Sequence, residues 1–304
     1  MKSYDILILG GGPAGITAGI YASRAQLKVG LLEKLMPGGQ VAVTEWIENY
    51  PGFEEGVAGP ELMQRMVKQA KRFGLEFLTG SVSDINLNGD TKKVTTKQEE
   101  YQAKTIIIAT GTDPKLLNVP GEDRFKGRGV SYCATCDGPF FKDKDIVVVG
   151  GGNSGIQEGL YLTRFVRSIQ LVEFMDHLNA EKILQKKARE NPKFKFFLNH
   201  KVISINGEQN VSSVTVEDRE TGEQKELNAD GVFIWVGMIP NTDFLPDKLK
   251  KDKYGFIITD ENMQTSVPGV YAAGDVREKE IRQITTAVGD GATAAEFALK
   301  YLEE

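Results

Sequence analysis

Residues 5–15 read Asp-Ile-Leu-Ile-Leu-Gly-Gly-Gly-Pro-Ala-Gly, an apolar segment that runs directly into a glycine cluster. The next segment, 16–24, has the apolar periodicity of a helix, and a second apolar strand over 27–32 ends on Glu33. A strand, a glycine-rich turn, a helix, a second strand and an acidic residue in this order form the βαβ fingerprint of dinucleotide binding. The opening of the chain therefore predicts a dinucleotide-binding fold.

The glycines of this cluster have separate roles in such a fold. Gly10 permits the tight turn after the strand, Gly12 lets the backbone approach a pyrophosphate, and Gly15 allows close packing of helix and strand. The positive end of the helix dipole favours the phosphates. A carboxylate at the position of Glu33 suits a ribose hydroxyl, so these four residues are candidates for cofactor binding.

The same pattern occurs a second time in the middle of the chain. A strand runs into Gly150-Gly151-Gly152-Asn153-Ser154-Gly155, and a helix and a second strand follow, the latter ending on Glu173. Glu173 lies 23 positions after Gly150, as Glu33 does after Gly10. A repeat of this length predicts two copies of the dinucleotide-binding fold.

We therefore predict an α/β protein with two Rossmann-like domains of the three-layer ββα type, the second inserted into the first. The character of the chain changes near Pro114 and again near 243, so one domain covers 1–113 and 244–304, and the other covers 114–243. Shorter strands are expected at 77–78, 82–86 and 93–96, as a β-meander.

Cys133 and Cys136 are the only cysteines, and two residues separate them. A pair so close can form a small disulfide and reopen it, which suits thiol–disulfide exchange. A structural zinc site needs about four ligands. The two histidines, His177 and His200, are not spaced as ligands, so no metal site is expected. Two inert thiols are the simpler alternative, but the flanking dinucleotide folds favour a redox motif.

The bulk composition excludes several classes of protein. The 304 residues carry a net charge of −5, which does not favour nucleic-acid binding. No apolar run approaches the roughly 20 residues of a membrane span. The first residues, Met1-Lys2-Ser3-Tyr4-Asp5, lack the longer apolar core of a signal peptide. We expect a cytoplasmic protein, and two cysteines are consistent with a reducing compartment.

The order of motifs resembles that of the low-molecular-weight, bacterial-type thioredoxin reductases from Asp5 to about Leu302. The shared motifs are the two glycine fingerprints, Gly-Gly-Gln at 38–40, Ala-Thr-Gly at 109–111, Cys-Ala-Thr-Cys-Asp at 133–137 and Ala-Gly-Asp at 273–275. The resemblance implies an FAD-dependent disulfide oxidoreductase that reduces thioredoxin and forms homodimers. It also implies rotation of the inserted domain about the crossings near 114 and 243.

The resemblance also assigns roles to residues. Cys133 and Cys136 would be the redox disulfide, and Asp137 matches the proposed general acid, although a turn or capping residue is an alternative for Asp137. The implied FAD-binding residues are Gly10, Gly12, Pro13, Ala14, Gly15, Glu33, Lys34, Gly39, Gln40, Asn49, Ala109, Thr110, Gly111, Gly274, Asp275, Arg282, Gln283 and Ile284.

The electron donor is where this chain departs from the usual family pattern. NADPH-dependent members carry arginines after the second fingerprint, where this chain reads Val172-Glu173-Phe174-Met175-Asp176-His177. A carboxylate there repels a 2′-phosphate, so NADPH is disfavoured, whereas hydrogen bonds from Glu173 to a ribose diol would suit NADH. The segment looks more like the pyridine-nucleotide-independent clostridial members, which implies reduced ferredoxin, our first candidate.

Two further alternatives concern the acceptor. The dithiol could serve another partner, such as a peroxidase system, in place of thioredoxin. A non-enzymatic FAD-binding redox sensor is the outside alternative, and the intact cysteine motif argues against it.

Overall fold

The structure is a computed structural model that describes residues 1–44, 47 and 49–303, with the side chains of Thr135 and Cys136 outside the described part. The chain divides into two units, Met1–Asp113 with Ile239–Glu304, and Pro114–Met238. The second unit is thus inserted into the first. The sequence placed the boundaries at 113/114 and 243/244, so the return crossing lies slightly earlier than expected.

The first unit is built on a parallel sheet whose strands are buried on both faces. Its order is β3-β2-β1-β6, with β17 on the far side of β6. Such strands read as continuous apolar runs, because neither face meets water. The strands are β1 (Lys2–Leu9), β2 (Val29–Glu33), β3 (Glu76–Thr79), β6 (Glu100–Ile108) and β17 (Val270–Ala272).

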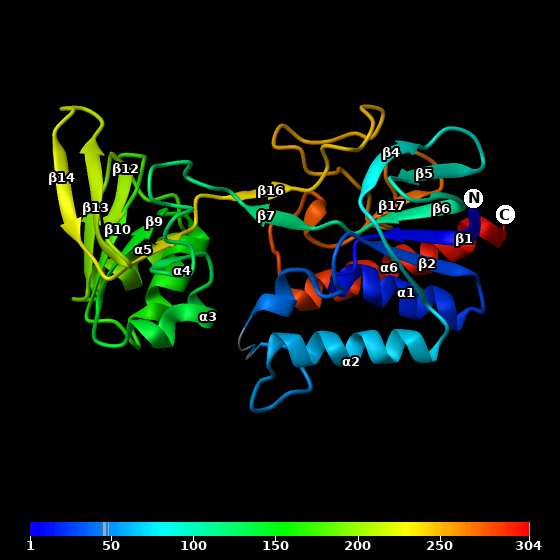
Figure 1. Ribbon diagram of the computed structural model, residues 1–304, viewed down its shortest axis with the longest axis horizontal. Helices are drawn as coiled ribbons and strands as arrows, with labels where there is room; N and C mark the ends of the chain where they lie inside the picture. Colours follow the sequence, from blue (N-terminus) through cyan, green and yellow to red (C-terminus); the bar gives the residue numbers. More distant parts are fainter. Residues whose placement is uncertain (45–46, 48, 304) are drawn as a thin grey trace. The chain divides into compact units, whose positions relative to one another are not determined.

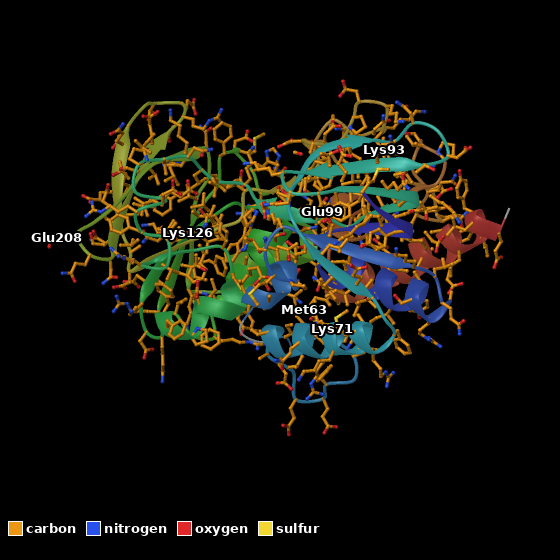
Figure 2. All side chains as sticks on the ribbon, turned by 45° about the vertical axis from the view of Figure 1, so that its right-hand side comes forward. Met63, Lys71, Lys93, Glu99, Lys126 and Glu208 are labelled. Carbon is orange, nitrogen blue, oxygen red and sulfur yellow. The ribbon has the colours of Figure 1, made fainter. Side chains whose placement is uncertain are left out.

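Helices α1 (Pro13–Arg24), α2 (Gly59–Arg72) and α6 (Ile284–Glu303) lie on one face of this sheet (Figure 1). Their apolar sides form one core with that face, in which Ile16 and Met63 are almost fully buried. Met63 and Lys71 are labelled on α2 in Figure 2, and only the first of them faces the core. The amphipathic pattern of α2 follows from this one-sided packing.

The opposite face is covered by antiparallel strands. β4 (Val82–Asn86) and β5 (Lys92–Thr96) pair with each other and β5 pairs with β6 (Figure 1). The expected meander was therefore wrong in one strand, since β3 joins the parallel sheet beside β2. The helix α2 connects β2 to β3, so β3 runs parallel to β2. The apolar periodicity of a strand does not show which strand it pairs with.

The second unit repeats these three layers. Its parallel sheet has the order β11-β10-β9-β15-β8, with helices on one face and the antiparallel sheet β12-β13-β14 on the other (Figure 1). The predicted fold class is confirmed. The strands are β8 (Val130–Ser131), β9 (Asp145–Val149), β10 (Ser168–Val172), β11 (Phe194–Phe197), β12 (His200–Gly207), β13 (Val211–Asp218), β14 (Gln224–Asn228) and β15 (Gly231–Ile234). The helices are α3 (Ala134–Asp137), α4 (Asn153–Leu162) and α5 (Lys182–Glu190).

Short elements complete the chain. The two connections between the units, β7 (Thr112–Pro114) and β16 (Met238–Pro240), pair with each other. Ile257 makes isolated bridges to Lys251 and Arg277. Three short 3₁₀ helices are η1 (Gly39–Val43), η2 (Gly138–Phe141) and η3 (Gly274–Val276). Within the described residues, no helix combines the length and the apolar content that a bilayer crossing requires.

Candidate functional site

The first glycine turn is shaped partly by the chain and partly for a ligand. Gly10 has a φ of +107°, and a Cβ there would clash with the Ala109 carbonyl, whereas a Cβ on Gly15 would clash with the carbonyl of Gly10. Gly12 is different, because a Cβ there would meet no atom of the described residues within 4 Å. The fold itself requires Gly10 and Gly15, and Gly12 leaves open space in front of α1.

Glu33 lies at the edge of this turn. Its carboxylate accepts hydrogen bonds from the backbone N–H of Gly11 at 2.7 Å and of Leu35 at 3.2 Å. Glu33 and Lys34 line a cavity of about 220 Å³ together with Gly10 and Thr110. Four of the predicted cofactor-binding residues therefore surround one cavity at the carboxyl ends of β1 and β2, where ligands bind in such folds.

The Ala109-Thr110-Gly111 turn closes the same cavity from the side of β6. The Thr110 hydroxyl donates to the carbonyl of Asn241 at 2.8 Å, and the Asn241 side chain donates to the carbonyl of Thr110 at 3.1 Å. Asn241 also lines the cavity, although the sequence did not indicate it. The small side chain of Ala109 faces Gly15, which explains the need for little bulk at both positions.

Asp275 carries an unpaired acceptor. Its Oδ1 is buried and has no hydrogen-bond partner among the described residues. Burial raises the pKa of Asp275, and the nearby positive charges of Lys279 and Arg282 oppose this rise. A buried oxygen without a partner is costly unless a ligand satisfies it. Asp275 is therefore suited to a hydroxyl donor of a bound cofactor.

Further predicted residues lie in loops and at helix starts of the first unit. The Arg282 guanidinium lies 4.2 Å from the centre of the Phe256 ring, and burial lowers its pKa. Asn49 donates to the side chain of Gln283 at 3.0 Å, which joins two predicted residues. The other members are Gly39, whose Cβ would lie 3.4 Å from Gly12 Cα, Gln40, whose amide donates to Asp113 at 3.1 Å, and Ile284, which begins α6.

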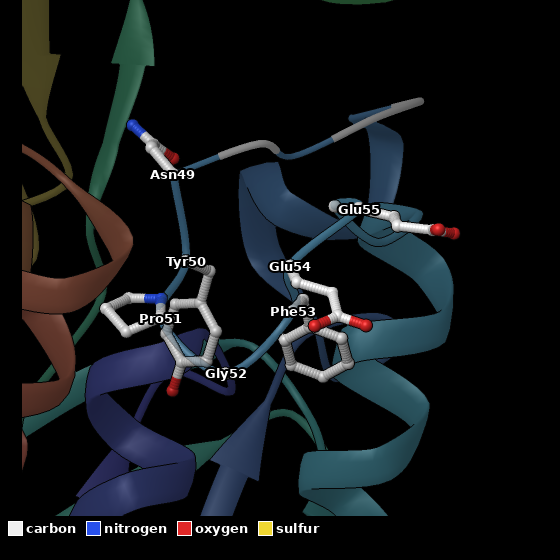
Figure 3. Close-up of a pocket in the computed structure, with 8 residues that line it drawn as sticks. Asn49, Tyr50, Pro51, Gly52, Phe53, Glu54 and Glu55 are labelled. Atoms are coloured by element: carbon white, nitrogen blue, oxygen red, sulfur yellow. The ribbon is translucent and has the colours of Figure 1, made fainter.

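A shallow hollow of about 820 Å³ adjoins Asn49 and is lined by residues 49–56 (Figure 3). The rings of Tyr50 and Phe53 lie 6.1 Å apart, and the Arg65 guanidinium lies 5.5 Å from the centre of the Phe53 ring. These contacts order a loop that is punctuated by Pro51 and Gly52.

The cysteine motif begins with Cys133 in the turn after β8 and continues into α3, in the second unit. Cys133 is disulfide-bonded, whereas the side chain of Cys136 lies outside the described part. The hydroxyl of Ser131 accepts from the N–H of Cys133 at 3.1 Å and lies 3.2 Å from its carbonyl, to which it can donate. The N–H of Asp137 donates to the same carbonyl at 3.2 Å. The role of Asp137 as a general acid stays a prediction.

The buried carboxylate of Glu122 holds the residue that precedes Cys133. Glu122 is 3% exposed and accepts from the Tyr132 hydroxyl at 2.7 Å and from the N–H groups of Leu117 and Asn118 at 2.9 and 2.7 Å. Burial and the hydrogen bond to Glu122 raise the pKa of Tyr132. Tyr132 directly precedes Cys133, so the network fixes the backbone at the start of the motif.

The second glycine turn has the same local geometry as the first. A Cβ on Gly155 would clash with the carbonyl of Gly150, and a Cβ on Gly152 would meet no atom within 4 Å. Glu173 is 8% exposed and accepts from the N–H of Gly151 and from the N–H of Met175, the latter at 2.9 Å. Glu173 therefore repeats the hydrogen bonds of Glu33.

One cation from a distant part of the sequence packs on Phe174, the residue after Glu173. The Arg219 guanidinium stacks 3.6 Å from the centre of the Phe174 ring and donates to the Phe174 carbonyl at 2.9 Å and to Asn199 at 3.2 Å. Phe174 remains 52% exposed. The arginine is thus engaged by neighbouring oxygens.

The chain is similar to known proteins over its whole length. A family model described as pyridine nucleotide-disulphide oxidoreductase matches residues 4–291. The chain is 47% identical to a thioredoxin reductase of Bacillus subtilis, in an alignment that covers 100% of this chain and 96% of that protein. The crystal structure of Lactococcus lactis thioredoxin reductase is 45% identical, with a TM-score of 0.83 and 99% of both chains covered.

This chain belongs to the thioredoxin reductase family. Its members are FAD-binding flavoproteins, so the FAD predicted from the sequence is confirmed. The open space at Gly12, the cavity at Glu33 and the unpaired oxygen of Asp275 fit an adenosine diphosphate with a hydroxylated chain. The binding roles of the individual residues stay predictions.

The resemblance to ferredoxin-dependent members is weaker. A ferredoxin-flavin thioredoxin reductase from Clostridium acetobutylicum is 29% identical, with a TM-score of 0.55 and 100% of this chain and 99% of that chain covered. Thioredoxin reductases of other bacteria reach 43 to 47% identity. The family is therefore shown, and the specific kinship with the clostridial ferredoxin-dependent enzymes is not.

Several residues of the site were missed by sequence reasoning. Asn241, Glu122 and Tyr132 carry no local signal, because their partners lie elsewhere in the chain. Asp290 had one signal, since Gly289-Asp290-Gly291 places two glycines inside a helical stretch. Glycine weakens a helix, so a glycine inside one needs a reason. At Gly291 the reason is close backbone approach, because a Cβ there would clash with the carbonyl of Ala14.

Proposed function

We propose that this protein reduces thioredoxin, with FAD bound by the first unit and Cys133 and Cys136 of the second unit as the redox pair. The observation that supports this most is the disulfide-bonded Cys133 in a turn held by Ser131 and Tyr132. The full-length similarity to thioredoxin reductases supports the same acceptor.

The two cysteines account for the exchange chemistry. FAD, when bound, supplies the ability to accept electrons from a donor and pass a pair to a disulfide. In the reduced protein, one cysteine thiolate attacks the thioredoxin disulfide, and the other then attacks the resulting mixed disulfide. Two electrons and two protons leave the protein dithiol, which becomes a disulfide, and thioredoxin leaves as a dithiol. Asp137 is positioned by its backbone hydrogen bond to Cys133 and would hold a proton for the leaving thiolate.

The first unit would hold the cofactor with hydrogen-bond donors for its phosphates and carboxylate acceptors for its hydroxyls. The N-terminus of α1 offers backbone N–H groups and a positive dipole end to the pyrophosphate, and Gly12 leaves the space for it. Glu33 would accept from a ribose hydroxyl, and Asp275 would accept from a hydroxyl of the ribityl chain. Each of these contacts satisfies a group that the chain leaves available.

For the electron donor we propose a carrier without a 2′-phosphate, with reduced ferredoxin as the first candidate. Glu173 stands where a 2′-phosphate would need positive charge, and like charges repel. Arg219 keeps its positive charge, because the Phe174 carbonyl and the Asn199 side chain that accept from its Nη1 are neutral. Arg219 is therefore the cation that would partly offset Glu173 if a 2′-phosphate did bind. The segment from Val172 to His177, which looks like that of the pyridine-nucleotide-independent members, supports ferredoxin. The whole-chain similarity does not add to this support, because the Clostridium acetobutylicum ferredoxin-flavin enzyme is 29% identical and the Bacillus subtilis thioredoxin reductase is 47% identical.

NADH is the second candidate, and one observation favours it. Glu173 accepts hydrogen bonds from Gly151 and Met175 in the same arrangement in which Glu33 accepts from Gly11 and Leu35. The arrangement proposed for the FAD ribose is thus available to a second ribose in the inserted unit. This arrangement offers nothing to a 2′-phosphate.

Anaerobic stopped-flow reduction of the purified yellow protein tests the donor. We expect bleaching of the flavin by reduced ferredoxin, slow or no bleaching by NADPH, and an intermediate result for NADH if the second site still binds it. Bleaching by NADPH within milliseconds would contradict the argument from Glu173.

A disulfide assay tests the acceptor. With the donor that reduces the flavin, we expect catalytic reduction of oxidised thioredoxin. A redox sensor would show no turnover. A reductase dedicated to a peroxidase system would turn over with that partner but would not reduce thioredoxin. The homodimer and the cytoplasmic location expected from the sequence stay predictions, and light scattering of the purified protein measures the former.

A further inference from the structure

A buried ion cluster lies directly beside the Gly274–Asp275 turn. The carboxylate of Asp290 in α6 is 12% exposed and accepts from the N–H of Gly274 at 3.0 Å. It also accepts from Arg277 at 3.0 Å and from Lys279 at 2.8 Å. The side chains of these two cations are only 14% and 11% exposed. Three donors thus use both oxygens of one carboxylate.

The cluster is packed against the glycine turn that receives the cofactor in the proposed function, on which this inference rests. Gly274 has a φ of +79°, and a Cβ there would lie 2.9 Å from the Cβ of Ala14 in the first turn of α1. A Cβ on Gly291, the neighbour of Asp290, would clash with the carbonyl of Ala14. The helical turn that carries Asp290 therefore joins the start of α1 to the Gly274–Asp275 turn.

We propose that Asp290 is a positioning residue for FAD, which holds the Gly274–Asp275 turn, through Gly274, Arg277 and Lys279, in the shape that receives the cofactor. Its own oxygens are used by the chain, so Asp290 acts through the turn and not as a ligand. Asp275 presents its unpaired Oδ1 from this turn, and a shift of the backbone would move that oxygen away from its cofactor partner.

Charge balance explains why the turn depends on this residue. Two cations that are largely removed from water need the carboxylate between them, because an unpaired buried charge is strongly unfavourable. Without Asp290, Arg277 and Lys279 would turn toward solvent and draw the segment that follows Asp275 with them. The N–H of Gly274 would lose its acceptor at the same time.

The experiment compares Asp290→Asn with a matched control, Asp5→Asn. Asp5 also accepts from one backbone N–H, that of Lys28 at 3.1 Å, and from one lysine, Lys104, at 3.0 Å. Asp5 lies near the amino end of β1, whereas Gly10 follows its carboxyl end. Each apoprotein is titrated with FAD, and the quenching of flavin fluorescence gives the dissociation constant. The melting temperature is measured with and without FAD.

For Asp290→Asn we expect FAD to bind at least tenfold more weakly, which corresponds to about 1.4 kcal/mol. The rise in melting temperature on adding FAD should shrink as well. Asp5→Asn should bind FAD within twofold of the parent and keep that rise. A purely structural role of Asp290 would lower the melting temperature with and without FAD by the same amount, and that result would overturn the proposal.

A second variant covers the case in which Asp290→Asn does not fold. Lys279→Gln removes one cation and leaves the hydrogen bonds from Arg277 and Gly274 to Asp290 in place. Because only one of the three donors is lost, we expect FAD to bind about threefold more weakly, less than for Asp290→Asn. FAD affinity within experimental error of the parent for Lys279→Gln would refute the positioning role. Neither measurement uses turnover, so the outcome is independent of the donor and the acceptor.

Discussion

The substitution Gly152→Ala distinguishes electron transfer from a nicotinamide nucleotide from electron transfer from a protein such as ferredoxin. Gly152 has φ −80° and ψ −179°, which any residue adopts, and no atom lies within 4 Å of the Cβ position. Gly12 has nearly the same backbone angles and the same open space. We therefore expect Gly152→Ala and Gly12→Ala to fold with stability within about 1 kcal/mol of the parent, because alanine restricts the unfolded chain whereas glycine is the better N-cap residue.

The added methyl group acts only on a bound dinucleotide. It would stand where the backbone approaches a pyrophosphate, and overpacking by one such group costs roughly 1–3 kcal/mol, or about ten- to hundredfold in affinity. Gly12→Ala should therefore lower the affinity for FAD by that factor. Gly152→Ala should keep FAD and slow flavin reduction by NADH by the same factor. Reduction by ferredoxin should stay within twofold of the parent.

Stopped-flow absorbance at the flavin band measures these rates, and thermal denaturation of each variant checks the fold. Gly155→Ala is the contrasting variant, since its Cβ would overlap the carbonyl of Gly150 and should destabilise the inserted unit. A Gly152→Ala protein that retains FAD and stability but accepts electrons from ferredoxin tenfold more slowly would refute the idea that the second glycine turn is idle in that reaction.

Three further perturbations follow from the site. Cys133→Ser should abolish thioredoxin reduction and leave the FAD content unchanged, and parental turnover would exclude the dithiol mechanism. Tyr132→Phe removes one of the three donors to the buried Glu122 and should lower the free energy of unfolding by about 1–3 kcal/mol. In the control Tyr254→Phe, at an exposed position, the free energy of unfolding should stay within about 0.5 kcal/mol of the parent. Equal effects of the two substitutions in urea denaturation would contradict the role of Glu122. Burial raises the pKa of Asp275 in the folded apoprotein above its ordinary value of 3.8, so the unfolded chain loses its proton first and apoprotein stability falls as the pH rises above that value. Asp275→Asn should therefore raise the melting temperature of the apoprotein at neutral pH and weaken FAD binding, and an unchanged FAD affinity would show that Asp275 does not contact the cofactor.

Local patterns determined the two dinucleotide folds. Gly10, Gly15, Gly150 and Gly155 are needed because a Cβ would clash within the same turn or with an adjacent strand end. The alternation of apolar strands, glycine turns and helices depends only on neighbouring residues, so it is legible in the sequence. The cysteine pair is equally local, because its chemistry follows from two thiols separated by two residues.

The tertiary structure alone decided which residues support these sites. Asp290 meets Arg277 and Gly274 only after α6 packs on α1, and Arg219 reaches Phe174 only after the β13–β14 turn folds against the end of β10. The partner of β3 was likewise misjudged, since it depends on the crossover through α2. Such contacts join residues far apart in the chain, and their energies depend on burial and charge pairing that appear only when the layers are assembled.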